Sequence, residues 1–384
     1  MPPVNGLILP GGGARNAYQA GVLKAIAELL GNDSPNPFPV ICGTSSGAIN
    51  AAVLASNAAQ FTEGVSRLTG IWENFHCGKV FQADSWTAVK SGLRWTTAFA
   101  TARLGSSGPH SLLDNRPQRL LIESHIRLAR IQHAIDRGAL RALAVTASSY
   151  SSGRSICYYQ GIPDLAPWER TRRLGRPQEI GIDHLMASSA IPVVFPAVWL
   201  NNEYHGDGSM RESAPLSPAI HLGANRLLII GVRNPQLDAV PANGAAPPYP
   251  SIGQISGYML DTLFMDSLDA DIERLQRINH LLAEAGKDSL SYQDSVLRPI
   301  DFLMICPSRD VREIAERHAG DFPRTVRYLL RGLGALSREG RPLVSYLLFE
   351  SAFCRELIEL GYRDGLAAGA EIAEFLRLEA PPSA

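Results

Sequence analysis

The sequence has few cysteines, and none of them stands where a disulfide framework or a metal site would need it. The five cysteines are an odd, widely spaced set without a C-x-x-C pair: Cys42, Cys77, Cys157, Cys306 and Cys354. The nine histidines do not cluster at the spacing of metal ligands, and the sequence has no D-x-D-x-D-G calcium loop. These absences indicate a reducing compartment and argue against a disulfide-stapled fold.

Long hydrophobic runs and an excess of charge are also missing. No stretch reaches the roughly 18 uninterrupted apolar residues that a membrane span requires, and the segment Met1 to Asn5 lacks the basic start of a signal peptide. The formal net charge is −1, so no overall field favours nucleic acid or an anionic surface. We expect a cytoplasmic protein that binds no nucleic acid, with peripheral membrane contact left open.

What the sequence does contain is an alternation of short apolar runs, glycine-rich turns and helical patterns. The run from Val4 to Leu9 ends in glycines and leads into a helical pattern at 15–30. The run from Pro39 to Cys42 is followed by a tight turn and a second helical pattern. Strand, turn and helix in this order predict the first units of a parallel sheet. With 384 residues, 45% of them hydrophobic, the chain can bury a large α/β core.

Three segments depart from this alternation. Residues 76–110 are irregular, carry basic and aromatic side chains such as Trp95, and contain no acid after Thr87. They predict either a lid over a pocket or a plain helical cap. Residues 233–251 are rich in Pro, Ala and Gly and predict a flexible surface loop. Everything after Asp310 has a helical pattern.

The sharpest chemical signal is the pentapeptide Gly43-Thr44-Ser45-Ser46-Gly47, a G-x-S-x-G between a predicted strand and a predicted helix. A nucleophilic serine must project from a cramped strand-to-helix turn, and glycines two positions either side remove side chains that would collide there. The amide of Ser46 would then point at an oxyanion formed on an acyl group. The placement favours Ser45 as a nucleophile over a plain glycine-rich turn.

A second signal is the glycine run Gly11-Gly12-Gly13, which precedes Ala14 and Arg15. Uncovered backbone N–H groups at a strand end, next to a helix start, form a site that attracts anions. A dinucleotide loop of the G-x-G-x-x-G type would need glycine at position 16, where Asn16 stands. The run therefore predicts an oxyanion hole, with a simple tight turn as the alternative.

A third signal is Gly206-Asp207-Gly208, which follows a strand-like run at 199–204. An aspartate between glycines can approach another loop closely and stay partly desolvated, which suits a base. An Asp-Gly turn by itself is most often only a turn. The local pattern alone therefore does not select Asp207.

Together, and in this order, the three motifs resemble those of the patatin-like phospholipase family, in particular its bacterial cytosolic branch. That family carries a G-G-G-x-R/K loop, a G-x-S-x-G elbow and a D-G-G/A motif that bears the base. Ser209 departs mildly from the small residue usual after Asp-Gly. The resemblance covers roughly residues 4 to 310, and further matches are Tyr18-Gln-Ala-Gly21, Ala187 to Pro192, Phe195-Pro196 and Ala214 to Pro218.

The resemblance implies an α/β fold: a three-layer α/β/α sandwich with a mainly parallel central sheet. It implies a catalytic domain over residues 1–310 and a helical extension over 311–384 packed on it. It also implies a serine lipid acyl hydrolase that cleaves fatty acyl esters through Ser45 and Asp207 without histidine, metal or organic cofactor. The oxyanion hole would comprise Gly11, Gly12, Gly13 and Ser46. Arg15 would either bind the phosphate of a lipid substrate or pack its own loop.

Three alternatives stay open. An ordinary Ser–His–Asp esterase would need a histidine, either His205 beside Asp207 or one of His221, His280 and His318 downstream. A non-catalytic acyl-lipid-binding protein would keep the fold and retain its ligand without turnover. An acyltransferase would share the first half-reaction and pass the acyl group to an acceptor other than water.

Overall fold

The computed structural model describes residues 3–31, 34–81, 111, 113–237, 249–286, 289–292, 295–337 and 340–377. Most of the lid predicted at 76–110 and of the loop predicted at 233–251 lies outside these residues, so neither prediction is tested. Among the described helices, none is both long enough and apolar enough to cross a bilayer.

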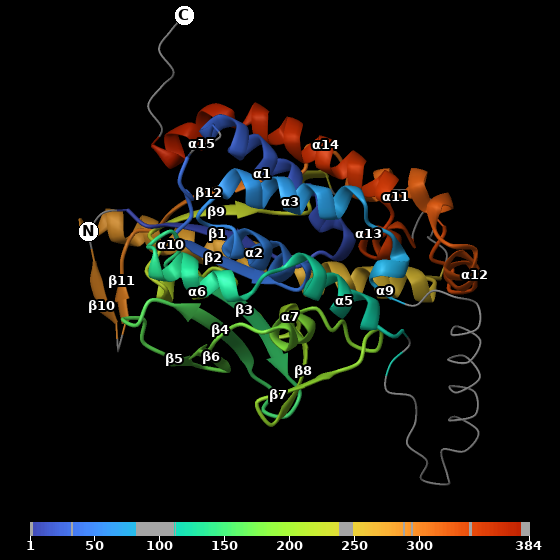
Figure 1. Ribbon diagram of the computed structural model, residues 1–384, viewed down its shortest axis with the longest axis horizontal. Coiled ribbons are helices and arrows are strands. Elements are labelled where there is room, and N and C mark those ends of the chain that lie inside the picture. Colours follow the sequence, from blue (N-terminus) through green and yellow to red (C-terminus); the bar gives the residue numbers. More distant parts are fainter. Residues whose placement is uncertain are drawn as a thin grey trace, which may run out of the picture.

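A ten-stranded mixed sheet forms the centre of the molecule, with the strand order β12-β9-β1-β2-β3-β4-β6-β5 and with β8 and β7 attached to β3 (Figure 1). The pairings from β12 to β3 are all parallel. A separate hairpin joins β10 to β11. The strands are β1 Asn5–Leu9, β2 Val40–Thr44, β3 Ala142–Ser149, β4 Ser155–Gly161, β5 Trp168–Arg170, β6 Arg173–Pro177, β7 Val198–Leu200, β8 Glu203–Asp207, β9 Arg226–Ile230, β10 Leu290–Tyr292, β11 Ser295–Leu297 and β12 Asp301–Ile305.

Helices cover both faces of this sheet, which confirms the three-layer α/β/α architecture and the helical C-terminal part expected from the sequence. A right-handed crossover from β1 to β2 and one from β9 to β12 run in opposite directions along the sheet, so their helices fall on opposite faces. The helices are α1 Ala17–Leu30, α2 Ser46–Ser56, α3 Phe61–Glu73, α5 Arg116–His125, α6 Ala129–Asp136, α7 Ile182–Ser188, α8 Ser217–His221, α9 Ile252–Asp261, α10 Ser267–Glu284, α11 Val311–His318, α12 Arg324–Gly332, α13 Arg341–Leu347, α14 Ser351–Ala367 and α15 Gly369–Leu376.

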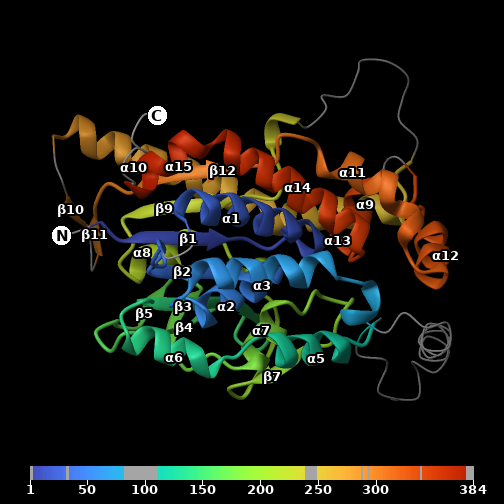
Figure 2. The ribbon, with the colours of Figure 1, turned by 45° about the horizontal axis from the view of Figure 1, so that its top comes forward.

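The C-terminal helix α14 lies directly along α1, as both ribbon views show (Figures 1 and 2). The two backbones approach so closely that glycine is required on each side. A Cβ on Gly21 would lie 2.0 Å from the carbonyl oxygen of Ile358, and one on Gly361 would lie 2.2 Å from that of Tyr18. Residues from the two ends of the chain therefore share one core.

The strand order also explains how two distant segments meet at one point. β2 runs parallel to β3 and ends at Thr44, opposite Thr146. β8 runs antiparallel to β3 along the same edge and ends at Asp207, opposite Ala147, the next residue of β3. The two strands thus run head-on toward each other, and their carboxyl ends meet.

The structure departs from the expected elements in three places. The strand-like run at 199–204 is a hairpin, because Asn201 and Asn202 both take positive φ and turn the chain between β7 and β8. The sequence from about Ile255 to Ala285 has one long helical pattern and predicts a single helix, but a π-helical turn at Thr262–Asp266 separates α9 from α10. The short strands β5, β6, β10 and β11 were not expected, because runs of three to five residues carry little periodic signal.

Candidate active site

Ser45 occupies the turn between β2 and α2, with a strained backbone. Its φ of 56° and ψ of −130° lie outside the regions that residues with a side chain prefer, at a typical cost of about 1–3 kcal/mol. The Ser45 amide donates a 2.9 Å hydrogen bond to Oγ of Ser188, and its carbonyl accepts one from Ala48. A strained serine between a strand and a helix, held by the surrounding packing, is the geometry expected for the predicted nucleophile elbow.

The glycines of the pentapeptide permit this turn by close packing. A Cβ on Gly43 would lie 2.4 Å from the carbonyl oxygen of Gly47, inside the turn itself. A Cβ on Gly47 would lie 2.1 Å from the carbonyl oxygen of Leu9, which ends β1. The elbow therefore rests directly on the start of the glycine-rich loop.

Asp207 faces the serine across the junction of β2 and β8. The Ser45 hydroxyl donates a 2.6 Å hydrogen bond to Oδ2 of Asp207, although the two residues are 162 positions apart. Oδ1 accepts a second hydrogen bond, from the amide of Ser209, at 3.0 Å. The carboxyl is fully buried. Burial raises its pKa from 3.8 to about 6, although the hydrogen bonds from Ser45 and Ser209 act in the opposite direction.

The glycine-rich loop is packed against three other segments. Gly11 faces the ring of Phe264 and the hydroxyl of Ser209, which a Cβ would approach to 2.7 and 2.8 Å. Gly13 has a φ of 56°, and a Cβ there would lie 2.3 Å from the carbonyl oxygen of Tyr346. Gly13 also lines the same cavity as Ser45 and Ser46. The structure thus brings the two predicted sources of oxyanion amides to one cavity.

Three buried polar side chains, which sequence reasoning missed, hold this loop. The carbonyl of Pro10 accepts hydrogen bonds from the amides of Asn16 and Gln19, at 2.9 and 3.1 Å. Asn50 of α2 donates to the side chain of Gln19 at 2.9 Å and accepts a bond from the indole of Trp72. The i, i+3 spacing of Asn16 and Gln19 on the turn after the glycines was the available signal. Paired buried amides of this kind fix a loop, since leaving one unsatisfied is costly.

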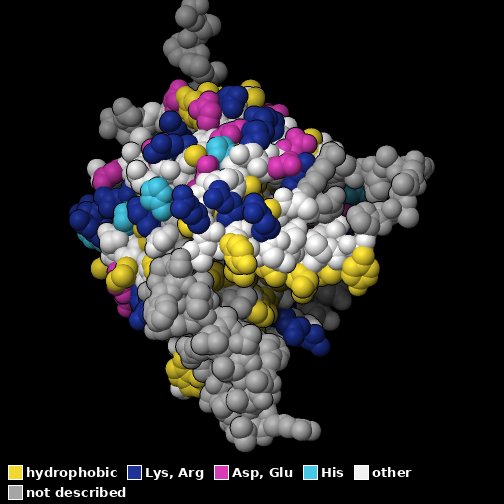
Figure 3. Space-filling view, turned by 90° about the vertical axis from the view of Figure 1, so that its right-hand side faces the viewer, with side chains coloured by type: hydrophobic (Ala, Val, Ile, Leu, Met, Phe, Trp, Pro, Cys, Tyr) yellow, Lys and Arg dark blue, Asp and Glu magenta, His cyan; other side chains and the backbone are white. Residues whose placement is uncertain are grey.

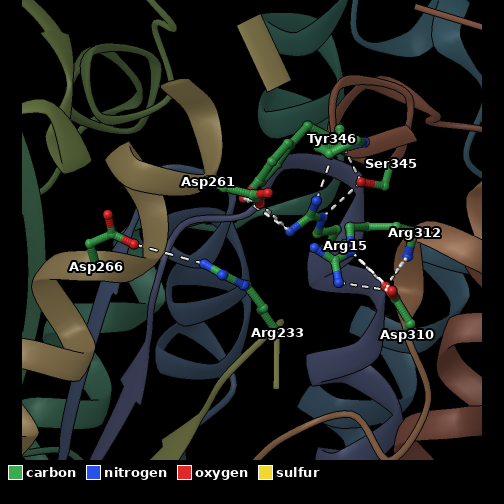
Figure 4. A network of polar contacts seen from close by, with 9 residues as sticks. Arg15, Arg233, Asp261, Asp266, Asp310, Arg312, Ser345 and Tyr346 are labelled. Atoms are coloured by element: carbon green, nitrogen blue, oxygen red, sulfur yellow. Dashed lines mark hydrogen bonds and ion pairs between the residues drawn. The ribbon is translucent and has the colours of Figure 1, made fainter. Parts of the chain in front are cut away.

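Arg15 is fully buried, and its side chain lies between the end of α9 and α13 (Figure 4). Its guanidinium donates to Asp261 at 2.9 Å and to Ser345 at 2.9 Å, and it lies 3.7 Å from the ring centroid of Tyr346. Burial alone would raise the pKa of Asp261, but the charge of Arg15 and the hydroxyl of Tyr346 together lower it. These contacts favour the loop-packing interpretation of Arg15. Its role in substrate binding stays a prediction.

His205 and His221, two of the histidines that a triad could use, contact other groups. His205 is buried with its ring against the hydroxyl of Tyr158 (3.0 Å) and the carbonyl of Glu203 (3.1 Å), and burial lowers its pKa. His221 stacks on Trp168 with a centroid distance of 4.7 Å. No histidine in the described part of the chain hydrogen-bonds to Ser45 or Asp207.

A second buried carboxyl, that of Glu212, lies near Ser45 and Asp207. Glu212 is 9% exposed, and burial raises the pKa of its carboxyl to about 7. The charge of Asp207 acts in the same direction, whereas hydrogen bonds from the hydroxyls of Thr44 and Thr146 lower this pKa. Thr44 precedes Ser45, and Thr146 precedes Ala147, the residue that pairs with Asp207. Sequence reasoning missed Glu212, because a single glutamate after a turn carries no pattern.

An apolar cavity, partly open to solvent, leads away from Ser45 along α2. Ile49 and Val53 follow Ser45 at successive turns of that helix, so the cavity extends roughly 12 Å from Ser45. Its far wall includes the stacked rings of Trp72 and Phe75, with Phe349 beside them. The other lining residues are Asn50, Leu68, Ile71, Val80, Gln118, Leu121, Ser189, Ile191 and Phe195.

The chain belongs to the patatin-like phospholipase family, whose sequence model matches residues 7–220. The family inferred from the three motifs is therefore confirmed, and the match includes the glycine-rich loop, the elbow and Asp207.

Individual relatives are more distant. A cGAMP-activated phospholipase of Pseudomonas aeruginosa is 26% identical over 215 residues, which are 56% of this chain and 55% of that protein. The chain thus matches little more than half the length of this curated relative. Human GIVD cytosolic phospholipase A2, solved with methyl γ-linolenyl fluorophosphonate, is 14% identical with a TM-score of 0.45, over 98% of this chain and 58% of that one. VipD from Legionella pneumophila is 13% identical with a TM-score of 0.32, over 93% and 67%.

Proposed function

We propose that this protein is a serine lipid acyl hydrolase in which Ser45 is the nucleophile and Asp207 is the base. One observation carries the proposal: the 2.6 Å hydrogen bond between the two side chains, buried at the end of an apolar cavity. A serine and a desolvated carboxylate in this geometry suit acyl transfer. Membership of a family of phospholipases supports the same reaction class.

The reaction follows from the positions of the groups. Ser45 Oγ attacks the ester carbonyl while Asp207 accepts the hydroxyl proton, and the backbone amides of the glycine-rich loop and of Ser46 stabilise the tetrahedral oxyanion. Collapse of the intermediate expels the alcohol, which takes the proton from Asp207 and leaves an acyl-enzyme. Asp207 then removes a proton from water, which attacks the acyl-enzyme. The fatty acid departs, and the proton returns to Ser45.

The raised pKa of Asp207 makes a histidine unnecessary in this proposal. An ordinary aspartate, with a pKa near 3.9, is a weak base at neutral pH. Burial brings the Asp207 pKa to about 6, close to that of the histidine usually found in such sites and still below neutral pH. The carboxylate is therefore both ionised and more basic than usual.

The cavity along α2 supports a fatty acyl chain as the part of the substrate that is recognised. Its walls are aliphatic and aromatic, and its direction follows the helix that begins with the oxyanion residue Ser46. Such a cavity would take up the chain of an ester whose carbonyl lies at Ser45. The phospholipase name of the Pseudomonas relative supports glycerophospholipids as the substrate class.

The test is to incubate the full chain and its Ser45→Ala variant with a mixed phospholipid extract and to quantify released fatty acids and lysolipids. We expect release by the wild-type chain and none by the variant. Acyl transfer to an added alcohol without fatty acid release would favour the acyltransferase alternative. Stable lipid retention without turnover would show a binding protein and contradict the proposal.

A further inference from the structure

Helix α9 turns its apolar side chains outward. Four of its large hydrophobic residues are exposed: Ile252 at 64%, Ile255 at 43%, Tyr258 at 70% and Met259 at 64%. Their spacing places all four within one stripe of the helix, about 120° wide. An ordinary surface helix shows the reverse pattern, with its apolar stripe toward the core.

The opposite stripe of α9 explains why the helix still packs well. Gly253 and Gly257 are buried there. A Cβ on Gly253 would lie 2.5 Å from Cα of Ala335, and a Cβ on Gly257 would lie 2.8 Å from the amide nitrogen of Leu343. The helix thus uses its small residues for internal packing. Its large apolar residues are left for an external partner.

Helix α12 supplies a basic border to this stripe. Arg324, Arg327 and Arg331 repeat at helical spacing, and Tyr328 between them is 81% exposed. The carbonyl of Leu333, just after α12, accepts a 2.8 Å hydrogen bond from the amide of Gly253 in α9, so the two helices are joined. Figure 3 looks onto this side, where hydrophobic side chains gather beside a row of basic ones.

The charge pattern of the two helices is one-sided. Neither residues 249–260 nor residues 322–337 contain an aspartate or a glutamate, and the second stretch contains three arginines. Exposed aliphatic and aromatic side chains beside arginines, with no acid among them, are the features by which helices settle at the interface of an anionic bilayer. A protein partner of neutral or basic surface would not explain the arginines.

We propose that the face formed by α9 and α12 docks this protein onto anionic phospholipid bilayers. Ile252, Ile255, Tyr258 and Met259 enter the headgroup region, and the arginines of α12 bind lipid phosphates. The choice of a bilayer over other partners rests on the proposed function, because a bilayer is where the substrate of a phospholipase lies.

This face belongs to the active-site side of the molecule. α9 ends at Asp261, which binds Arg15, the second residue after the three glycines. The π-helical turn that follows places the ring of Phe264 against Gly11 of the same loop. The segment that would dock is therefore continuous with residues that contact the glycine-rich loop.

The test uses the full chain with Ser45→Ala, so that vesicles are not hydrolysed. Co-sedimentation is measured with phosphatidylcholine vesicles and with phosphatidylcholine–phosphatidylglycerol vesicles, before and after Met259→Asp. Leu281→Asp is the matched control, because Leu281 is also 64% exposed but lies on α10. We expect Met259→Asp to weaken the vesicle partition constant about tenfold or more, and Leu281→Asp to leave it unchanged.

A charge-reversal pair tests the second half of the proposal. Arg331→Glu should weaken binding to the anionic vesicles about tenfold and leave binding to phosphatidylcholine alone unchanged. Arg137→Glu, at the exposed end of α6, should leave binding to both kinds of vesicle unchanged. Equal binding by the Met259 and Leu281 variants would overturn the proposal. The proposal would also be overturned if the parent chain does not bind vesicles but forms a dimer that Met259→Asp dissociates. In that case α9 would be a contact between two copies of the chain.

The outcome is separable from that of the proposed function. Turnover of a soluble butyrate ester by the chain with Ser45 intact does not require a bilayer. Vesicle binding without ester turnover would leave the docking face standing and refute the hydrolase. Ester turnover without vesicle binding would do the opposite.

Discussion

Replacing Asp207 with Asn should remove a loss of stability that the wild type suffers as the pH rises, while it destroys the proposed base. The carboxyl is fully buried, and its pKa rises from 3.8 to about 6. When the pKa of a carboxyl is higher in the native protein than in the unfolded chain, the carboxyl stabilises the native state fully at a pH below its unfolded pKa. This stabilisation is lost as the pH rises through the native pKa. Asn has the same shape and no such loss.

The magnitude follows from the pKa difference. Each unit of pKa corresponds to about 1.4 kcal/mol, so ionising Asp207 in the native protein costs about 3 kcal/mol more than in the unfolded chain. At pH near 4, the wild type has lost roughly 0.5 kcal/mol of the corresponding stabilisation. At pH near 8, it has lost nearly all of it. The stability of the Asn variant relative to the wild type should therefore increase by about 2.5 kcal/mol between these two conditions.

The assay is urea denaturation of both chains at the two pH values, followed by circular dichroism. The quantity of interest is the difference between variant and wild type, so pH-independent effects of the Asn amide cancel. Glu212 is present in both chains, so only its repulsion from the Asp207 carboxylate remains in the difference, and this repulsion enlarges the expected increase at high pH. A difference that stays constant between the two pH values would refute the reasoning, because the carboxyl would then have an ordinary pKa and no special basicity.

Three further predictions concern the loop and the cavity. Gly47→Ala should lower kcat about 10²-fold or prevent folding, because its Cβ would lie 2.1 Å from the carbonyl oxygen of Leu9; Gly70→Ala, with no atom within 4 Å of its Cβ, should instead stabilise the chain by about 0.5–1 kcal/mol in urea denaturation. Val53→Phe should reduce kcat/KM about tenfold for long-chain esters and leave butyrate esters unaffected, because the ring would fill the distal cavity; equal losses would contradict this placement of the acyl chain. Arg15→Lys should lower kcat equally for a neutral short ester and a phospholipid, because lysine cannot reproduce the guanidinium contacts that hold the loop; a loss confined to the phospholipid would instead support a phosphate-binding role.

The parts of the site that sequence predicted are those built from neighbouring residues. The elbow around Ser45 can be recognised because the strand, the glycines and the helix that create it are contiguous. The strand-to-helix units on either side follow the same local rules. Asp207 could be selected only through the family resemblance, because its contact with Ser45 depends on two strands meeting head-on along β3.

The parts that sequence could not predict depend on distant segments. Arg15 finds its carboxylate partner 246 residues away, at the end of α9. The buried state of Glu212 arises from the threonines of two separate strands. Helical periodicity identified the region of α9 as a helix, but it could not tell which stripe faces the core, because there the glycines pack inward.

The most direct test of the central claim, a catalytic pair without histidine, is a comparison of kcat for Asp207→Asn and His205→Ala. Both variants are measured on one soluble short-chain ester, with folding verified by circular dichroism. The proposal predicts a loss of about 10³-fold or more for Asp207→Asn. For His205→Ala it predicts a loss under about tenfold, equivalent to about 1.4 kcal/mol in the barrier at most. A His205 variant as inactive as the Asp207 variant would contradict the pair and restore a triad.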